Sequence, residues 1–557
     1  MLRKPTRRDL LIGVGAAGIA STAPAGRSWS ARTVARPTLF VDSELGDDGR
    51  DGRTPATAWR TLSRVSAAGE GAAGEVVGMA RGRLWREVLR VPASRMSFVP
   101  YGSGAKPVVC GAEPRTEWLA DRPFGRARTW SAAQLKDPGL HVFADHRRLT
   151  PAPSRLDMDE GSFWWDGAAK RLHVWLRGGA DPRAHRMEVA KQATCCDVAD
   201  VADVRLYGIV FEKARRYGLK ARAGVARLTA VECEFMRNGL IGIHIGDGSE
   251  AGERTAEHPD AAIIACRAAY NLGSGIVGLN RVTRIRIVGT VAHHNAQTDR
   301  LGDYHGNIRI VSDFVPGATE LPQNRPAECL IEGCVSYAAG KDESGRTVVS
   351  SERGHGIWLD TAGPRSWIRY CRSFDNAKSG VYYEWGGDDC AGGLEGNLAY
   401  GNETGVLLAR RTAGAVVRNN TAVANGTGLW ITGEWGGESD RYGFRDNQVY
   451  DNVAVDNGVN LLVSWGAEER SNSYHHNCFG RERGGFVQWG FDRPLDSYEA
   501  LEAAHGAKMH NVEAEPMISL SANGELSVAP GSPILGAGAD GSDVGADPAE
   551  LPSAQMR

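Results

Sequence analysis

The stretch Glu395–Leu408, EGNLAYGNETGVLL, contains two asparagines five positions apart, followed by a short apolar segment that begins with glycine. The same arrangement recurs from about Val201 onward, with Cys, Thr or Asn at the position of Asn397. The equivalent segments are Val231–Phe235, Ile264–Ala268, Val288–Ala292, Glu332–Ser336, Arg369–Ser373, Arg418–Ala422, Tyr450–Ala454 and His475–Phe479. The shortest interval separates Asn397 from Asn420, and longer ones contain polar insertions. A repeat of roughly 20 to 30 residues with strands and turns but no helical pattern is typical of a β-solenoid, and here predicts about nine or ten coils.

The second asparagine of the repeat predicts how the coils hold together. It recurs as Asn238, Asn271, Asn295, Asn376, Asn402, Asn425 and Asn457, whereas Ala339 is an exception. Asparagine side chains stacked on successive coils can hydrogen-bond to one another along the stack. The glycine-led segments that follow, such as Gly380–Tyr383 and Gly428–Ile431, are therefore expected to stack as rungs of one parallel sheet.

The ten cysteines would suggest a disulfide framework if the protein is exported. However, Cys233, Cys266, Cys334 and Cys371 occupy the repeat position that asparagine takes in later coils. They are predicted to be small buried thiols stacked in the core. A catalytic or metal-binding cysteine is the alternative, but no partner histidine is expected on the same face.

The overall composition indicates a folded, β-rich chain without a charge-driven partner. The 557 residues include 70 glycines but only 24 prolines, which suits many tight turns between short strands. Lysine and arginine total 65 against 67 acidic residues, a net charge of −2. This balance gives no reason to expect nucleic acid or an anionic membrane as a partner.

The N-terminus has the pattern of an export signal. Thr6–Ile12 carries paired arginines, Leu10–Ala20 is apolar, and small residues surround Ala23–Ala25. The pattern resembles a twin-arginine signal, which implies cleavage near Ala25 and a soluble protein in the periplasm or outside the cell. A membrane anchor is the alternative, but the apolar run falls short of the roughly 20 residues needed to span a bilayer.

The chain divides into five predicted regions. These are a signal peptide at 1–25, an N-terminal cap with the first coils at 37–114, a small β insertion at 115–190, parallel β-helix repeats at 191–490 and a C-terminal cap at 491–557. The cap, with a helix-like segment at Leu495–Ala504, is expected to cover the open end of the solenoid and its sheet edge. In the insertion, Trp164 and Trp165 are expected in the core rather than as sugar platforms.

Three segments resemble secreted right-handed parallel β-helix proteins that act on polysaccharides: Leu39–Asp42 with the loop Gly46–Gly52, Tyr101–Pro107, and Pro530–Gly538. The resemblance implies an all-β, right-handed parallel β-helix. It does not specify the reaction, because lyases, hydrolases and epimerases share this fold. The acidic loop Gly46–Gly52 could bind Ca²⁺, although a solvated turn is the favoured interpretation, and no cofactor is predicted.

Two aligned strings place a pair of acids on neighbouring rungs. Gly356–Asp360 (GIWLD) and Gly380–Glu384 (GVYYE) align without a gap, one coil apart. Because side chains alternate between the faces of a strand, inward Ile357 and Leu359 leave Trp358 and Asp360 outward. The same reasoning places Tyr382 and Glu384 outward. Adjacent strands lie about 4.8 Å apart, so Asp360 and Glu384 are predicted to be direct neighbours on the outer face.

Such a pair has a chemical use. Like charges opposite each other on adjacent strands cost up to about 1 kcal/mol. Two carboxylates about 5 to 5.5 Å apart are what a retaining glycosidase needs, and their repulsion raises the pKa of one of them. Acids that bind a metal or a sugar, or a pair without function, are the alternatives.

The GIWLD string, followed one coil later by an acid after two aromatic residues, looks like the active-site segment of the parallel β-helix glycoside hydrolases that include β-xylosidases. This resemblance implies that Asp360 is the nucleophile and Glu384 the acid/base. The chain departs from the family pattern at Thr361–Gly363 and Trp385–Gly387. The identity of the substrate is therefore not carried over.

An oligo- or polysaccharide is the expected partner, bound in a groove along the acids. Insertions at Asp247–Asp260, Asp313–Pro326 and Lys341–Arg353 are expected to add loops over one face. Aromatic rings stack on sugars, arginine binds carboxylates, and histidines at strand starts can contact substrate or transfer protons. The predicted substrate-binding residues are Trp358, Tyr382, His305, His355, Asn307, Arg309 and Trp430.

Two other functions remain open. A polysaccharide lyase or C5-epimerase needs a base and a group that neutralises the carboxylate of a uronate. Candidates for these roles are Lys341, His305, His355, Tyr382 and Arg309. A glycan-binding solenoid without catalytic activity is the third class, and Asp360 and Glu384 would then be dispensable.

Overall fold

The computed structural model describes residues 35–122, 128–134, 136–139, 141–247, 256–301, 305–313, 324–350, 353–433, 443–469, 471–483, 486–490 and 493–553. The predicted signal peptide at 1–25 lies outside this part of the chain. In the part that is described, no helix has the length and apolar character needed to cross a membrane.

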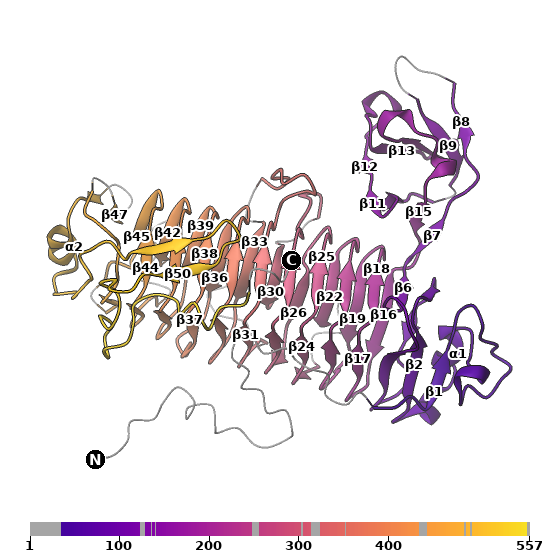
Figure 1. Cartoon of the computed structure of the whole chain (residues 1–557), viewed down its shortest axis with the longest axis horizontal. Coiled ribbons are helices and arrows are strands. Elements are labelled where there is room, and N and C mark those ends of the chain that lie inside the picture. The colour runs from indigo at the N-terminus through magenta and orange to yellow at the C-terminus, as the bar shows by residue number, and fades with distance from the viewer. Residues whose placement is uncertain are drawn as a thin grey trace.

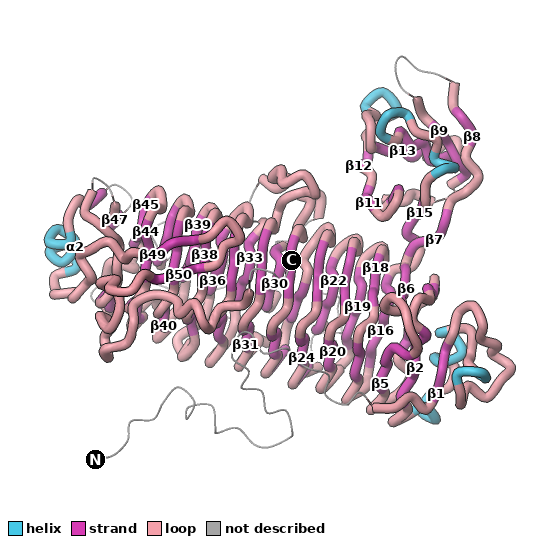
Figure 2. Tube along the Cα trace, viewed as in Figure 1, coloured by secondary structure: helices cyan, strands magenta, loops and turns pink. Residues whose placement is uncertain are grey.

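The chain coils into a right-handed parallel β-helix with three long sheets (Figures 1 and 2). Sheet I, of 13 strands, consists of β1 (Leu39–Val41), β2 (Val76–Ala80), β5 (Ser97–Tyr101), β17 (Arg205–Tyr207), β20 (Thr229–Val231), β24 (Ala262–Ile264), β28 (Arg286–Val288), β31 (Leu330–Glu332), β34 (Trp367–Arg369), β37 (Gly393–Glu395), β40 (Val416–Arg418), β43 (Gln448–Tyr450) and β46 (Ser473–His475). Sheet II, of 11 strands, consists of β3 (Leu84–Trp85), β6 (Val108–Cys110), β18 (Val210–Glu212), β21 (Glu234–Met236), β25 (Arg267–Ala269), β29 (Val291–His293), β32 (Val335–Tyr337), β35 (Arg372–Phe374), β38 (Leu398–Tyr400), β41 (Thr421–Val423) and β44 (Val453–Val455).

Sheet III, again of 13 strands, carries the residues of the predicted site. It consists of β4 (Leu89–Arg90), β16 (Thr194–Ala199), β19 (Tyr217–Arg222), β22 (Ile241–Gly246), β26 (Ile276–Leu279), β30 (Gly306–Val311), β33 (His355–Asp360), β36 (Ser379–Glu384), β39 (Thr404–Ala409), β42 (Thr427–Thr432), β45 (Val459–Ser464), β47 (Val487–Trp489) and β48 (Pro494–Leu495). From β2 to β45, each coil passes through sheets I, II and III in turn. The all-β parallel β-helix predicted from the repeat is confirmed.

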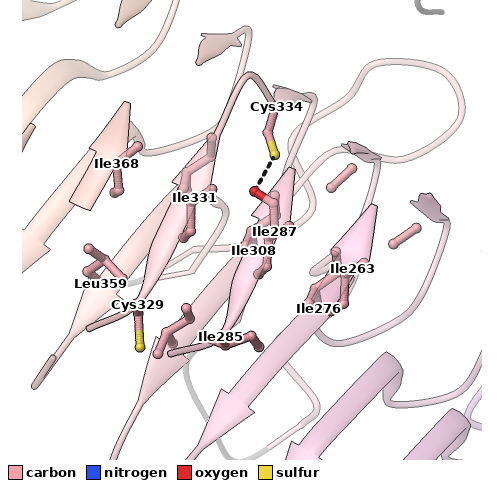
Figure 3. Close-up of a cluster of buried hydrophobic side chains, with 14 of the residues drawn as sticks. Ile263, Ile276, Ile285, Ile287, Ile308, Cys329, Ile331, Cys334, Leu359 and Ile368 are labelled. Carbon is pink, nitrogen blue, oxygen red and sulfur yellow. Dashed lines mark hydrogen bonds between the residues drawn. The ribbon is translucent and has the colours of Figure 1, made fainter. Parts of the chain in front are cut away.

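Equivalent residues of successive coils stack on one another in the core. Ile263, Ile287, Ile331 and Ile368 follow each other in register along sheet I. Figure 3 shows these isoleucines facing Ile308 and Leu359 of sheet III across the interior. Because each coil contacts mainly the next one, an aliphatic side chain repeated at the same position gives a continuous, close-packed core.

The asparagine ladder forms as predicted, and it explains the exception at Ala339. Asn295 Oδ1 accepts hydrogen bonds from the backbone N–H and the side-chain Nδ2 of Asn271, at 3.1 and 2.8 Å. One coil later the acceptor is Asn307 Oδ1, 2.9 Å from Asn295 Nδ2, and Asn307 Nδ2 donates onward to Asn376 Oδ1 at 3.3 Å. In the coil where Ala339 stands at the ladder position, the side chain of Asn307 therefore takes the place of the missing asparagine.

This position corrects one prediction about the site. Asn307 was expected to face outward as a substrate-binding residue, but it is fully buried in the ladder. It lies opposite Gly356 in the register of β30 and β33. A Cβ at Gly356 would point at Ser373 Oγ and Asn376 Nδ2, inside the solenoid. Strict alternation of faces fails here because the chain turns from sheet II into sheet III at this position.

Cys233, Cys266, Cys334 and Cys371 are buried thiols, as predicted, and so are the other six cysteines. All ten cysteines lie in the described residues and are free and buried. Cys334 Sγ donates to Ile287 O at 3.4 Å, which Figure 3 shows as a dashed line. Burial raises the pKa of the thiols of Cys266 and Cys371 well above the usual value. These cysteines act as small core side chains that bond to the backbone of the preceding coil.

Residues between sheet II and sheet III near the N-terminus form two small sheets beside the solenoid (Figure 1). The strands are β7 (Ala112–Pro114), β8 (Leu119–Ala120), β9 (Trp130–Ala133), β10 (Val142–Ala144), β11 (Arg147–Arg148), β12 (Thr150–Pro151), β13 (Ser162–Asp166), β14 (Arg171–Trp175) and β15 (Met187–Ala190). Their shared core contains Phe163, Leu172 and Val174. Trp164 and Trp165 are both partly buried; Trp164 stacks on His173, and Trp165 Nε1 donates to Gln134 O.

The acidic loop near the N-terminus serves a structural purpose. Asp48 accepts hydrogen bonds from the backbone N–H groups of Arg60 and Thr61 and from the Thr61 hydroxyl. Thr61 in turn caps helix α1 (Leu62–Ser66). The carboxylate thus holds the start of the helix that covers the first coils.

The C-terminal region covers more than the end of the solenoid. Helix α2 (Tyr498–His505) packs at the end against β47, close to the expected helix. The chain then turns back, and the hairpin of β49 (Ile518–Leu520) and β50 (Leu526–Val528) lies beside sheet II (Figure 1). Leu526 packs on Leu398, and Arg372 donates to Glu525 at 3.0 Å. The remaining short pair is β23 (His258–Pro259) with β27 (Val282–Thr283).

The role of Asn307 can be tested by its removal and by a rescue. In N307G the donors of Asn295 lose their buried acceptor, which is expected to lower the free energy of unfolding by about 2 kcal/mol. The double variant N307G/A339N restores the regular ladder of the other coils and is expected to recover most of that stability. Melting temperatures followed by circular dichroism measure both effects. Equal melting temperatures for N307G and wild type would contradict this role.

Candidate functional site

The two acids predicted from the aligned strings are direct neighbours. In the parallel register of β33 and β36, Asp360 pairs with Glu384 and Trp358 with Tyr382. All four side chains lie on the outer side of sheet III, opposite the core residues Ile357 and Leu359. The predicted adjacency of the carboxylates is confirmed by this register.

Three donors surround the Glu384 carboxyl group. Trp358 Nε1 donates to Oε1 at 3.1 Å, and the Tyr382 hydroxyl donates to Oε2 at 2.6 Å. Arg410 Nε lies 3.2 Å from Oε2 in an ion pair. Both oxygens are therefore held, and the plane of the carboxyl group is fixed by side chains from three consecutive rungs.

Asp360 has its own counter-charge. Arg309, one rung before Asp360 in sheet III, donates from Nη2 to Asp360 Oδ2 at 2.7 Å. The same guanidinium lies over the ring of Trp358, 4.5 Å from its centroid. Arg309 was predicted to face outward beside the acids, and the structure places it there.

Aromatic and aliphatic side chains form a row along the outer side of sheet III. Trp358 and Tyr382 are parallel, with centroids 5.3 Å apart and an interplanar angle of 7°. Leu407 pairs with Tyr382 on the next rung, and Trp430 with Leu407 on the rung after that. Trp430 is partly buried, and its Nε1 donates to Ser464 Oγ at 3.1 Å. Trp430 therefore belongs to the same apolar cluster but lies two rungs from Glu384.

Arg410 was missed by the sequence analysis, although the repeat contained a signal for it. Arg410 follows Ala409, which pairs with Glu384 in the register of β36 and β39. Its φ of 54° lies in the left-handed region and turns the chain sharply at the end of the rung. Trp385 occupies the same corner one coil earlier, also with a φ of 54°. Aligning these corners as well as the strands would have placed an arginine beside Glu384.

The pair is more enclosed than the sequence suggested. Asp360 is 8% exposed and Glu384 only 2%. The prediction of outward orientation is correct, but the open outer face implied by it is not found, because Trp358, Tyr382 and their neighbours pack over the strands. Water is largely removed from the acids, which strengthens every charge interaction among them.

Burial changes the acidity of Glu384. Removal from water raises its pKa from the usual 4.5 to about 7, and the charge of Asp360 acts in the same direction. Arg410, Tyr382 and Arg309 favour the ionised form and oppose the shift. The desolvation of a fully buried carboxyl group outweighs these partners, so Glu384 holds a proton up to near-neutral pH.

The two predicted histidines differ in their relation to the acids. His355 packs against Trp358 and Tyr382, at centroid distances of 4.7 and 5.1 Å. His305 is buried at the preceding rung, where Nδ1 lies 3.1 Å from Ser274 Oγ. Neither histidine is at an open edge, because both are at most 3% exposed.

The structure therefore brings together Asp360, Glu384, Trp358, Tyr382, Arg309 and His355, and adds Arg410 to them. Lys341, a candidate base for the lyase alternative, instead forms an ion pair with Asp375. In the described part of the chain, no group of three His, Cys, Asp or Glu side chains is placed to hold a metal ion.

Comparisons with known proteins agree with the fold. A family model described as a right-handed β-helix region matches residues 221–434. The structure of XylC in complex with xylose is similar with a TM-score of 0.59 at 12% identity, covering 88% of this chain and 89% of XylC. A glycoside hydrolase structure gives 0.47 at 12% identity, covering 85% of this chain and 99% of that one. GH136 lacto-N-biosidase from Eubacterium ramulus gives 0.38 at 13%, covering 71% and 64%. A search of curated protein sequences gave no significant match.

The raised pKa of Glu384 predicts how stability changes with pH. Because folding raises this pKa, the group stabilises the folded state at low pH, and that contribution is lost as pH rises from about 4.5 to about 7. E384Q cannot titrate. The melting temperature of E384Q minus that of wild type is therefore expected to increase between pH 5 and pH 7 and to level off above. A difference that does not change with pH would contradict the raised pKa.

Proposed function

We propose that the protein is an exported glycan-degrading enzyme, a retaining glycoside hydrolase that uses Asp360 and Glu384. The observation that carries the proposal is the pairing of the two carboxyl groups on adjacent rungs, with the pKa of Glu384 raised to about 7. An acid that keeps its proton near neutral pH next to a carboxylate with an arginine partner is the combination that glycoside cleavage requires.

The spacing of the rungs supports retention of configuration. Side chains paired on adjacent parallel strands start about 4.8 Å apart. Retaining enzymes hold their carboxyl groups about 5 to 5.5 Å apart, whereas inverting enzymes need about 6.5 to 9.5 Å to admit a water molecule. Direct neighbours such as Asp360 and Glu384 fit the first arrangement.

The surroundings of the two acids suggest their roles. In the first step, an Asp360 oxygen attacks the anomeric carbon, the glycosidic bond breaks, and the Glu384 proton passes to the leaving oxygen. In the second, the Glu384 carboxylate takes a proton from water, whose oxygen attacks the anomeric carbon and releases Asp360. Trp358, Tyr382 and Arg410 fix the orientation of Glu384 in both steps.

The similarity to XylC, solved with xylose, supports a sugar as the substrate. We propose an oligo- or polysaccharide, reached after export by the twin-arginine route to the periplasm or the outside of the cell. Contact of the sugar with Arg309, Trp358 and Tyr382, the side chains beside the acids, is part of this proposal, although the two rings are 3% exposed and stack on each other.

The geometry supports a lyase or C5-epimerase less well. The Tyr382 hydroxyl donates to Glu384, and burial raises its pKa well above 10, so it is poorly suited as a base. Lys341 is paired with Asp375. A binding protein without catalysis would gain nothing from a buried carboxyl pair that costs stability.

Removal of either acid tests the proposal. On a panel of 4-nitrophenyl glycosides, D360N is expected to lose turnover, since no nucleophile remains. E384Q is expected to lose about 10² to 10⁴-fold in kcat/KM, the usual contribution of general acid–base catalysis. Adding azide to E384Q with a dinitrophenyl glycoside should restore turnover and give a glycosyl azide of retained configuration, identified by NMR.

A matched control is D197N, which removes an acid of β16 that also lies in sheet III and pairs with an arginine, Arg222. It should retain wild-type turnover. Full activity in both D360N and E384Q would exclude the proposed mechanism. Cleavage of a uronate-containing polysaccharide to a product with the ultraviolet absorbance of an unsaturated uronate would indicate a lyase instead.

The proton on Glu384 also predicts a pH profile. Only the protonated form can act as the acid, so kcat/KM of wild type is expected to fall about tenfold per pH unit above pH 7. Burial is the main cause of the raised pKa that sets this decline; Asp360 adds to it, whereas Arg410, Tyr382 and Arg309 oppose it. In E384Q the decline near pH 7 should be absent. A wild-type rate that stays constant from pH 6 to pH 9 would contradict Glu384 as the acid.

A further inference from the structure

His355 has a fixed orientation at the start of β33. Its Nδ1 accepts a hydrogen bond from the backbone N–H of Ser379, on the next rung, at 3.3 Å. The nitrogen that accepts cannot carry the proton, so the proton of the neutral ring is on Nε2. The imidazole is thereby tied to the backbone of β36, the strand that carries Glu384.

The ring of His355 contacts both aromatic donors to Glu384. It is tilted by 49° against Trp358 and by 43° against Tyr382. Trp358 holds Oε1 of Glu384, and Tyr382 holds Oε2. One imidazole therefore packs against two of the three side chains that hold the Glu384 carboxyl group.

Direct contact of His355 with a substrate, which the sequence suggested, does not fit its surroundings. Nδ1 is already bonded to Ser379, the ring packs against Trp358 and Tyr382, and Nε2 is buried with no hydrogen-bond partner among the described residues. The faces of neighbouring aromatic rings are weak acceptors for such an N–H group. A buried nitrogen enclosed in this way is placed to hold its neighbours rather than to reach a sugar.

We propose that His355 is a positioning residue of the hydrolase. Its imidazole, anchored by Ser379, keeps Trp358 and Tyr382 in hydrogen-bonding contact with Glu384. The Glu384 carboxyl group is thereby held in the orientation needed to donate its proton. The inference rests on the proposed function, because it assigns His355 to the acid of that reaction. Its effect on catalysis passes through the two aromatic side chains.

The neutral state of the imidazole suits this role. Burial lowers the pKa of His355 to about 3, and the nearby charges of Arg309, Lys378 and Arg410 act in the same direction. A charged ring would add a cation to a site that already contains two arginines. His355 thus keeps one protonation state, and one set of contacts, throughout the pH range in which Glu384 titrates.

Orientation of an acid matters most when the leaving group needs protonation. A dinitrophenolate leaves without help, whereas an alkoxide requires the proton. Loss of the positioning residue is therefore expected to slow alkyl glycosides far more than dinitrophenyl glycosides. A loss of packing alone, without effect on Glu384, would slow both kinds of substrate equally.

A double-mutant cycle between His355 and Tyr382 tests the proposal. In H355N the side-chain oxygen can still accept from Ser379, but the part of the ring that contacts Trp358 and Tyr382 is removed. Y382F keeps the ring and removes the hydroxyl donor. On a methyl glycoside of the sugar selected by the panel, each single variant is expected to lose about tenfold in kcat/KM. The double variant should lose little more than either single, because both changes disturb the same contact.

The role of His355 and the proposed hydrolase function fail under different outcomes. Additive losses, about 100-fold in the double variant, or equal losses on methyl and dinitrophenyl glycosides, would overturn the role of His355. Melting temperatures show whether each variant is folded, and H355Q is measured in the same cycle if H355N is not. E384Q decides the proposed function separately: if E384Q keeps full activity, the hydrolase mechanism itself fails.

Discussion

Successive coils of this solenoid can stack only if the buried polar groups at their turns form hydrogen bonds with the neighbouring coil. The asparagine ladder meets this requirement, because each side-chain oxygen accepts from the backbone and the side chain of the preceding asparagine. If one coil shifted by one residue against the next, the asparagine side chains would no longer meet, and buried donors would stay unpaired. The ladder therefore fixes the register of the coils. The pairing of Asp360 with Glu384 follows from that register rather than from any attraction between them.

The corners of the coils provide a second set of positions with defined geometry. At one corner of sheet I, residues with a positive φ carry charges of alternating sign on successive coils. These are Asp203, Arg227, Asp260, Arg284, Glu328 and Arg365. Arg227 pairs with Asp203 at 2.7 Å and Arg284 with Asp260 at 2.6 Å. At a different corner, where the rungs of sheet III end, a positive φ likewise accompanies the approach of Arg410 to Glu384.

The candidate site combines features that oppose each other energetically. Burial of Glu384 next to Asp360 disfavours its ionised form, whereas Arg410, Tyr382 and Arg309 favour it. The result is a carboxyl group that is rigidly held and still able to carry a proton near neutral pH. In a solvated pair, water would weaken both the repulsion and the hydrogen bonds, and neither the orientation nor the acidity would be fixed. Sites of chemistry commonly contain such locally unfavourable arrangements, which the regular structure around them supports.

The sequence by itself determined the solenoid, the equivalence of its coils and the adjacency of Asp360 and Glu384, because a repeat with one residue type at a fixed position implies stacking. It also predicted the buried cysteines for the same reason. Only the tertiary structure decided the burial of the acids, the inward position of Asn307 and the contacts of His355. These depend on how the backbone turns at the corners and on how side chains from three rungs pack together, and neither is expressed in the alternation of residues along one strand.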